Sequence, residues 1–164
     1  MKKSETARLK ARAWKLFSEY IRRKSAAQDG SVRCYTCGIV DHWKNMDCGH
    51  GIGGRGNFVL FLEEICRPQC KKCNIFLSGN YESFIPKLII EYGIWKYSCW
   101  TTEAKKPFKR QKSDYMDIID DYTARLAEMN SGMPTKGAGN RPKSDDLPKA
   151  MATQGVKKKP AKRR

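Results

Sequence analysis

The chain has 164 residues, a length that fits one domain with tails better than two full domains. It carries 33 Lys and Arg residues against 17 Asp and Glu residues, and this net charge of +16 favours a polyanionic partner such as nucleic acid. No apolar run approaches the roughly 20 residues that span a bilayer, and the basic start does not lead into a secretory segment. We therefore predict a cytoplasmic protein without a membrane partner.

The start of the chain predicts a basic amphipathic helix over residues 5–27. Large apolar side chains recur there at steps of three and four residues, which is the period of one helix face. Ser4 is a suitable N-cap, and Asp29-Gly30 is a turn signal that ends the helix. The basic residues between the apolar ones, including Arg22 and Arg23, are predicted either to contact phosphates or to form a solvated face.

The middle of the chain changes from loops to helices. Residues 31–66 are rich in Cys, Gly and turn signals, which predicts hairpins and loops. Apolar side chains at helical spacing then predict one helix that ends at Gly93 and another over residues 113–129 that Ser113 caps. We expect Pro86 to lie near the start of the first helix or to break it.

The end of the chain has a different composition. Residues 131–164 contain ten Lys or Arg and two Asp, with almost no large apolar side chains, so we predict a disordered basic tail that attracts phosphates. The chain thus divides into a basic N-terminal helix, a Cys-rich module, a helical segment and a tail. Their predicted bounds are 1–30, 31–95, 96–130 and 131–164.

Two CxxC motifs stand 32 residues apart, Cys34-Tyr-Thr-Cys37 and Cys70-Lys-Lys-Cys73. The two thiolates of such a motif can bind one ion from a tight turn, and two motifs complete a tetrahedron with no open position. We therefore predict a structural zinc site that helps to fold a segment with little core of its own. Its ligands are Cys34, Cys37, Cys70 and Cys73. Of the other cysteines, Cys48 and Cys66 are alternative ligands, and Cys99 is predicted to be a packed thiol.

Side chains suited to phosphodiester hydrolysis lie between the two motifs and directly after them. They are Asp41, His42, Asp47, His50, Arg55, Asn57 and Asn74. A neutral imidazole can take a proton from water, and Asp and Asn oxygen atoms hold a hard cation such as Mg²⁺. Together with cationic groups for the developing charge, they supply what the reaction needs.

A hairpin that carries a His, closed by a CxxC-Asn that starts a helix, resembles the HNH (His-metal finger) nucleases. It is most similar to their junction-cutting phage endonuclease VII branch, in which Asn replaces the last His. A closer resemblance is to the phage recombination protein family NinG, also called Rap, over roughly residues 7–93. The segments that carry it are KARAWKLFSEYIRRKS, CYTCG, DHWKNMDCGH, RPQCKKCNIFLSGNYESF and YG.

The resemblance implies a small α+β fold in which amphipathic helices flank a zinc-stapled ββα-metal module. It also implies a structure-directed endonuclease that cuts branched DNA, such as Holliday junctions, D-loops or flaps, during phage recombination. The cysteines match the zinc ligands, His50 matches the general base, and Asn74 matches the residue that binds or orients a catalytic Mg²⁺ or Mn²⁺. If the chain is phage-encoded, it would act in the cytoplasm of the bacterial host.

The acidic ligand of the catalytic metal departs from the family pattern. In many HNH proteins an acidic residue directly precedes the His, whereas here Gly49 does and Asp47 lies three positions back. On a regular strand that spacing puts Asp47 and His50 on opposite faces. Asp47 therefore joins the catalytic residues only if the chain bulges or turns at Cys48-Gly49.

Other residues of the module have weaker signals. The middle Asn of the HNH pattern is absent before the second motif, and Asn57, Glu63 or Glu64 could replace it. His42, next to Trp43, is predicted to be structural. The predicted nucleic-acid contacts are cationic residues of the module and of the first helix, namely Arg55, Lys71, Lys72, Arg22 and Arg23.

Two classes of function compete. The first is a metal-dependent endonuclease in which His50 deprotonates the attacking water. The second is a zinc-dependent DNA-binding recombination accessory protein without catalysis, favoured by the missing acidic neighbour of His50 and the missing Asn. RNA is a less favoured substrate. Paired cuts would suit a homodimer, with the helices over 5–27 and 113–129 as candidate interfaces.

Overall fold

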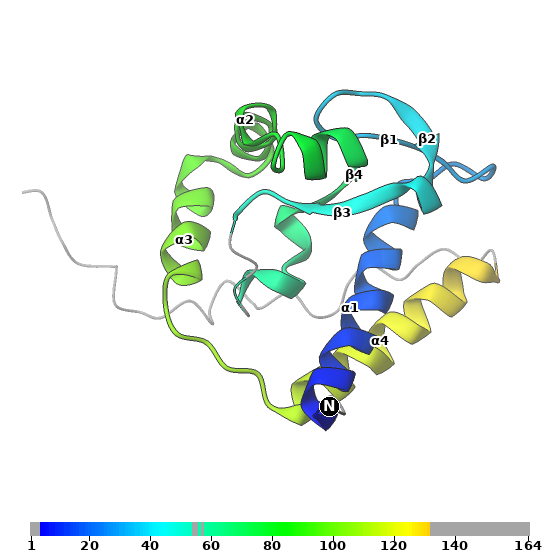
Figure 1. Cartoon of the computed structure of the whole chain (residues 1–164), viewed down its shortest axis with the longest axis vertical. Coiled ribbons are helices and arrows are strands. Elements are labelled where there is room, and N and C mark those ends of the chain that lie inside the picture. The colour runs from blue at the N-terminus through cyan, green and yellow to red at the C-terminus, as the bar shows by residue number, and fades with distance from the viewer. Residues whose placement is uncertain (1–3, 54–55, 57, 132–164) are drawn as a thin grey trace, which may run out of the picture. The chain divides into compact units, whose positions relative to one another are not determined.

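The apolar pattern near the start of the chain folds as helix α1 (Glu5–Arg23) in the computed structural model, which describes residues 4–53, 56 and 58–131 (Figure 1). The Ser4 hydroxyl accepts a hydrogen bond from the Ala7 N–H at 3.3 Å, so the predicted N-cap is confirmed. The helix ends at Arg23 rather than at residue 27, because the chain turns there and the Ala26 N–H bonds to the Arg23 carbonyl.

Helix α4 (Lys112–Asn130) packs beside α1 (Figure 1). Lys112 forms an ion pair with Glu5, and Arg23 donates to the Asn130 side chain at 2.6 Å, so the two helices run parallel. The predicted Ser113 cap is wrong, because a capping box at Gln111 starts the helix two residues earlier. The carboxylate of Asp114 accepts from the Gln111 N–H at 2.7 Å, and the Gln111 side chain accepts from the Asp114 N–H in return.

Two antiparallel hairpins form the β part of this small α+β fold. Strand β1 (Ser31–Arg33) pairs with β2 (Val40–His42), and β3 (Met46–His50) pairs with β4 (Cys66–Cys70). Short 3₁₀ turns at Trp43–Asn45 (η1), Val59–Phe61 (η2) and Glu63–Ile65 (η3) connect them. The prediction of hairpins and loops for this region is confirmed.

Three helices follow one another from the second CxxC motif to Ala104. A short π-helix, η4 (Lys72–Phe76), is followed by α2 (Tyr81–Tyr92) and α3 (Ile94–Ala104). Gly93 separates α2 from α3 with a φ of +82°, so the predicted stop is confirmed. The expectation for Pro86 is wrong, because α2 runs through it without a break. Pro86 is exposed, so its ring is not packed against other elements.

The β3–β4 hairpin lies between α1 on one side and α2 on the other (Figure 1). The main core gathers there, from the hairpin and the helices around it. Its buried side chains include Phe17, Ile21, Cys48, Ile65, Cys66, Phe84, Leu88, Trp100, Tyr122 and Leu126. The hairpin is therefore held from both faces, and its position relative to η4 and α2 is fixed by packing.

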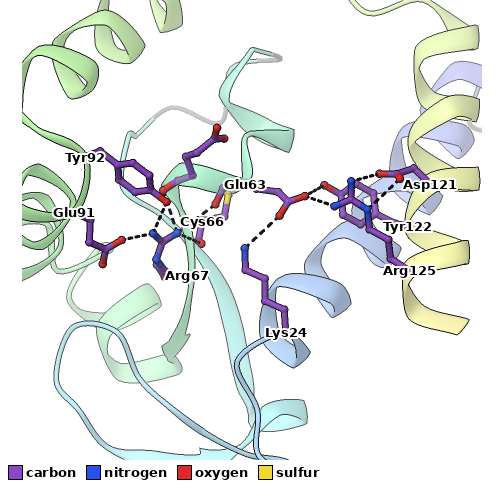
Figure 2. Close-up of polar contacts among 10 residues, drawn as sticks. Lys24, Glu63, Cys66, Arg67, Glu91, Tyr92, Asp121, Tyr122 and Arg125 are labelled. Atoms are coloured by element: carbon purple, nitrogen blue, oxygen red, sulfur yellow. Dashed lines mark hydrogen bonds and ion pairs between the residues drawn. The ribbon is translucent and has the colours of Figure 1, made fainter. Parts of the chain in front are cut away.

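A carboxylate ties η3 to both long helices (Figure 2). Glu63 accepts a hydrogen bond from the Tyr122 hydroxyl at 2.7 Å and forms an ion pair with Arg125, both on α4. Its other oxygen pairs with Lys24, just beyond α1, at 3.3 Å. Because Arg125 is also paired with Asp121, the cluster connects three elements through charged hydrogen bonds.

A guanidinium ties β4 to α2 in a similar way (Figure 2). Arg67 forms an ion pair with Glu91 and donates to the Tyr92 hydroxyl at 3.1 Å. It also donates to the carbonyl of Cys66 at 2.9 Å. The pKa of Arg67 is raised because these acceptors outweigh the burial that lowers it.

The residues from 132 onward, where the disordered tail is predicted, lie outside the described part of the chain. No helix among the described residues has the length and apolar character needed to cross a bilayer. The described residues belong to one compact unit. The four-part division of the chain stays a prediction.

Candidate functional site

The four cysteines of the two CxxC motifs meet in space. Cys34 and Cys37 lie between β1 and β2, Cys70 ends β4, and Cys73 lies in η4. Their sulfur atoms are all within 4.8 Å of one another, and those of Cys37 and Cys70 are 3.7 Å apart. In a tetrahedron with Zn–S bonds of about 2.3 Å, the sulfur atoms are about 3.8 Å apart. The cluster can therefore hold a zinc ion, as the spacing of the motifs predicts.

Electrostatics at the cluster also suit a cation. The Cys70 N–H donates to the sulfur of Cys34 at 3.3 Å, and the Thr36 hydroxyl lies 3.4 Å from the same sulfur. Burial raises the pKa of Cys34. Hydrogen bonds from the Cys37 and Cys70 backbone and from Thr36 outweigh burial and bring the pKa down to about 6. Burial and the neighbouring thiols raise the pKa of Cys70 to about 12. Without a cation, four adjacent thiols cannot all ionise, and a zinc ion removes that conflict.

Asp47 and Asn74 lie side by side. The Asn74 amide nitrogen donates to a carboxylate oxygen of Asp47 at 3.0 Å, and both side chains are partly buried. Strands β3 and β4 pair one-to-one from the Met46–Cys70 pair to the His50–Cys66 pair, so the bend expected at Cys48-Gly49 is absent from the hairpin. Asp47 contacts Asn74 without a bend in β3, because η4 places Asn74 on the face of β3 that carries Asp47.

His50 ends β3 on the opposite face, as strand alternation predicts. Its ring stacks on Trp14 of α1, with the ring centroids 5.4 Å apart, and it is 7% exposed. Its Nε2 lies 3.2 Å from the Leu60 carbonyl oxygen. A carbonyl can only accept, so this contact places the proton on Nε2 and the lone pair of the neutral ring on Nδ1. The contact therefore orients the ring and selects Nδ1 as its basic atom.

A pocket of about 140 Å³ joins the two halves of the candidate site. Both His50 and Asn74 line it, whereas Asp47 lies behind the wall and contacts it only through its hydrogen bond with Asn74. The rest of the wall comes from the loop after β3, the turn after η4 and the start of α2. These residues are Ile52, Gly53, Ser78, Gly79 and Tyr81.

The predicted nucleic-acid contacts have different environments. Lys71 and Lys72 are exposed at the start of η4, next to the pocket wall. Arg22 is partly buried and donates to the carbonyls of Trp43 in η1 and of Met46 at the start of β3, at 3.3 Å each. Arg23 pairs with Glu19 on its own helix at 3.0 Å. The two lysines are thus the better placed of these for a phosphate near the pocket.

Asn57, Glu63 and Glu64 are the residues considered for the place of the missing Asn. Asn57 and the predicted phosphate contact Arg55 lie outside the described residues. Glu63 is held by α1 and α4, and neither it nor Glu64 lines the pocket. His42 accepts from the Lys44 N–H at 3.2 Å, which fits its predicted structural role.

Sequence reasoning missed Gln69, which is fully buried beside the site. It lies opposite Asp47 in the hairpin, and its amide nitrogen donates to the Gly79 carbonyl at 2.9 Å and to the Thr36 hydroxyl at 3.2 Å. It therefore connects β4 to the pocket wall and to the first CxxC motif. A polar residue between Pro68 and Cys70 was the available signal, and it has no periodicity that separates it from a surface residue.

Comparison with protein families gives one match. The model described as Bacteriophage Lambda NinG protein matches residues 2–131, which include every described helix and strand. Searches of curated proteins and of solved structures gave no match.

Proposed function

The chain belongs to the NinG family, and from this premise we propose that it is a metal-dependent endonuclease that cuts branched DNA in phage recombination. The observation that carries the proposal is the contact of Asp47 with Asn74 at a pocket that His50 also lines. An imidazole and an amide at one opening, with a carboxylate bonded to the amide, are the groups that the HNH reaction would need.

The donor set fits a hard cation. The side-chain atoms of Asp47 and Asn74 are 3.0 Å apart, which is also the spacing of adjacent oxygens around Mg²⁺ with bonds of about 2.1 Å. An Asn side chain can present its oxygen or its nitrogen at one position, so Asn74 can serve as a ligand where it now serves as a donor. Bound Mg²⁺ or Mn²⁺ would stabilise the negative charge that develops on the phosphate.

The protein's own groups have separate tasks in this proposal. His50 accepts the proton of the attacking water, while the Leu60 carbonyl keeps the ring oriented through Nε2. Lys71 and Lys72 attract the phosphate backbone. The cysteine cluster joins the β1–β2 turn, β4 and η4, so zinc would hold Asn74 against the β3–β4 hairpin.

The test is cleavage of a labelled four-way junction, a flap and a linear duplex, with and without Mg²⁺. His50→Ala should lower the single-turnover rate on the junction by about 10²- to 10⁴-fold, the usual contribution of a general base. Asn74→Ala should also lower it and should require more Mg²⁺. His42→Ala is the matched control, because His42 lies outside the pocket and should leave the rate unchanged.

Zinc content and circular dichroism of each variant separate loss of chemistry from loss of fold. A correctly folded, zinc-loaded His50→Ala protein that cuts the junction at the normal rate would disprove the role of His50. An RNA junction of the same sequence tests the less favoured substrate.

The burial of His50 favours a second candidate function. Its ring is covered by Trp14, and an imidazole that acts only in packing would have the same surroundings. In that case the chain is a zinc-dependent DNA-binding recombination accessory protein. Tight junction binding without cleavage, in Mg²⁺ and in Mn²⁺ across pH 6 to 9 or so, would support this candidate over the nuclease.

A further inference from the structure

Three consecutive large apolar side chains project into solvent directly after Asn74. Ile75 is 58% exposed, Phe76 is 80% exposed and Leu77 is 49% exposed. Single exposed apolar residues are common on soluble proteins, but a contiguous group marks a surface that binds something. We call Ile75, Phe76 and Leu77 the apolar ridge.

The backbone fixes the apolar ridge in place. The Leu77 N–H bonds to the Lys72 carbonyl at 2.9 Å, and the Gly79 N–H bonds to the Cys73 carbonyl at 3.0 Å. Ser78, Gly79 and Asn80 all have positive φ, a run of left-handed backbone that closes the turn after η4. Because Cys73 of the cluster lies two residues before the ridge, the projection of the ridge does not depend on burial of its own side chains.

The apolar ridge lies at the rim of the candidate pocket. Asn74 before it and Ser78 and Gly79 after it line the pocket, whereas the three ridge side chains between them face solvent. Lys71 and Lys72, also exposed, precede them. One short segment thus presents cations, a candidate catalytic amide and an exposed aromatic ring.

We propose that Phe76, flanked by Ile75 and Leu77, stacks on an unpaired base at the branch point of the DNA. This inference rests on the proposed function and gives it a source of structure selectivity. Bases at a branch can be unstacked at little cost, whereas those of a linear duplex are paired and stacked on both sides. An aromatic ring stacks on any base, and apolar wedges insert at distorted base steps. The ridge therefore selects for branches without reading sequence.

Charge favours nucleic acid over a second copy of the chain as the partner. In a symmetric dimer through the ridge, Lys71 and Lys72 of one copy would face the same two lysines of the other, and like charges would repel. DNA phosphates instead attract these lysines, because phosphates lie beside any base that the ridge contacts.

The experiment measures binding in Ca²⁺, which is used to suppress cleavage, with 2-aminopurine at the branch point of a four-way junction. Phe76→Ala should lose about 5- to 150-fold in junction affinity, the range for loss of one base–aromatic stack. It should also lose the fluorescence change that stacking produces. Its affinity for a linear duplex should stay unchanged. Phe76→Trp should keep both the junction affinity and the fluorescence change, because Trp also stacks. Phe76→Leu should lose part of each, because Leu is apolar but has no ring.

Met116→Ala is the matched control, because Met116 is also apolar and 53% exposed but lies on α4. It should bind the junction like the unmodified protein. If Phe76→Ala retains normal junction affinity and the normal fluorescence change, the stacking proposal is wrong. It is also wrong if Phe76→Ala instead turns a dimer into a monomer in sedimentation, or if the unmodified protein does not bind the junction.

Cleavage assays in Mg²⁺ separate this inference from the proposed function. If the unmodified protein binds the junction through Phe76 but cuts nothing, the stack is supported and the nuclease is not. If the unmodified protein and Phe76→Ala both cut, with the same ratio of junction to duplex cleavage rates, the nuclease is supported and the stacking proposal is overturned.

Discussion

Gly49 gives strand β3 room for a buried amide. A Cβ atom at this position would lie 2.0 Å from the side-chain oxygen of Gln69, closer than real contacts allow. Gln69 cannot move aside freely, because its nitrogen is held by Gly79 and Thr36. The glycine is therefore needed for space, whereas the sequence suggested that it was needed for a bend.

Gly49→Ala should lower the free energy of unfolding by about 1 to 3 kcal/mol, the usual result of overpacking a filled site. Urea denaturation followed by circular dichroism measures the change. Gly56→Ala is a control, because a Cβ there meets its nearest neighbour at an ordinary 3.7 Å. An unchanged urea midpoint for Gly49→Ala would show that Gln69 can leave its position.

At the scale of single residues, the sequence predicted that four cysteines form one metal site, because two CxxC motifs leave few other arrangements that satisfy one metal. It also named His50 and Asn74, which share a pocket, although their catalytic roles stay predictions. It could not place Gln69, since nothing in a short polar–apolar segment shows that an amide will be buried. The contact of Asp47 with Asn74 depended on where η4 lies, which only the tertiary structure fixes.

Among the elements, η3 depends on the charge of Glu63 for its contacts with α1 and α4. Burial raises the pKa of Glu63. Lys24, Tyr122 and Arg125 outweigh burial, so the pKa of Glu63 is lowered overall. A lowered pKa stabilises the fold above the ordinary pKa of the unfolded chain. That stability is lost as the pH falls through the lower pKa of the folded chain.

Glu63→Gln should therefore lower the free energy of unfolding by about 1.5 to 3 kcal/mol at pH 7, the range for hydrogen bonds to charged groups. The difference from the unmodified protein should shrink in acid, once Glu63 is protonated in both states. Urea titrations between neutral and acidic pH measure this. Glu82→Gln, at an exposed position on α2, is the control. A difference that stays constant with pH would contradict the ion-pair explanation.

Helix α2 contains a proline that its geometry tolerates but does not use. Pro86 is exposed, and as a proline it has no N–H to bond to the carbonyl of Glu82. Pro86→Ala should raise the free energy of unfolding by about 1 to 3 kcal/mol, since Ala is the better helix former. Thermal unfolding measures the gain. A lower melting temperature would mean that the ring makes a contact that the helix needs.

The helices show where pattern reading succeeds and where it fails. The helices predicted over 5–27 and 113–129 are present as α1 and α4, because each has a long apolar stripe that finds a partner. No separate helix was predicted where α3 lies. Ile94 and Trp95 at its start are exposed, whereas Trp100 is buried in the core, so its apolar residues do not all mark a buried face.

For the whole molecule, the cysteine cluster is the link between parts that are distant in sequence. A structural zinc ion contributes about 10 to 16 kcal/mol of apparent binding free energy in zinc-finger peptides, against about 5 to 15 kcal/mol for the stability of a whole domain. We therefore expect one zinc ion per chain by emission spectroscopy. Chelation should lower the melting temperature strongly.

Cys37→Ser should reduce the zinc content, and Co²⁺ added to the unmodified protein should give the visible absorption of a tetrahedral thiolate site. Cys99→Ser is the control, because Cys99 lies on α3, apart from the cluster, and should leave zinc binding intact. Full stability in a chelator, with no metal bound, would contradict a structural role for zinc.

The architecture itself was only partly predictable. Composition and pattern indicated helices on either side of a Cys-rich region of hairpins and loops, the family resemblance implied an α+β fold, and the structure has these parts. The parallel pairing of α1 with α4 could not be predicted, because it joins segments about one hundred residues apart and each stripe would suit many partners.

This pairing of the first and last described helices sets an order for folding during synthesis. The ribosome makes α1 first, yet Phe17 and Tyr20 of α1 contact Tyr122 of α4, with ring centroids 5.1 Å and 5.2 Å apart. Part of the stripe on α1 therefore stays uncovered while the cysteine motifs emerge and close. Nascent chains that stop short of α4 would present this stripe to chaperones, and the unit would complete its fold only once α4 has been made.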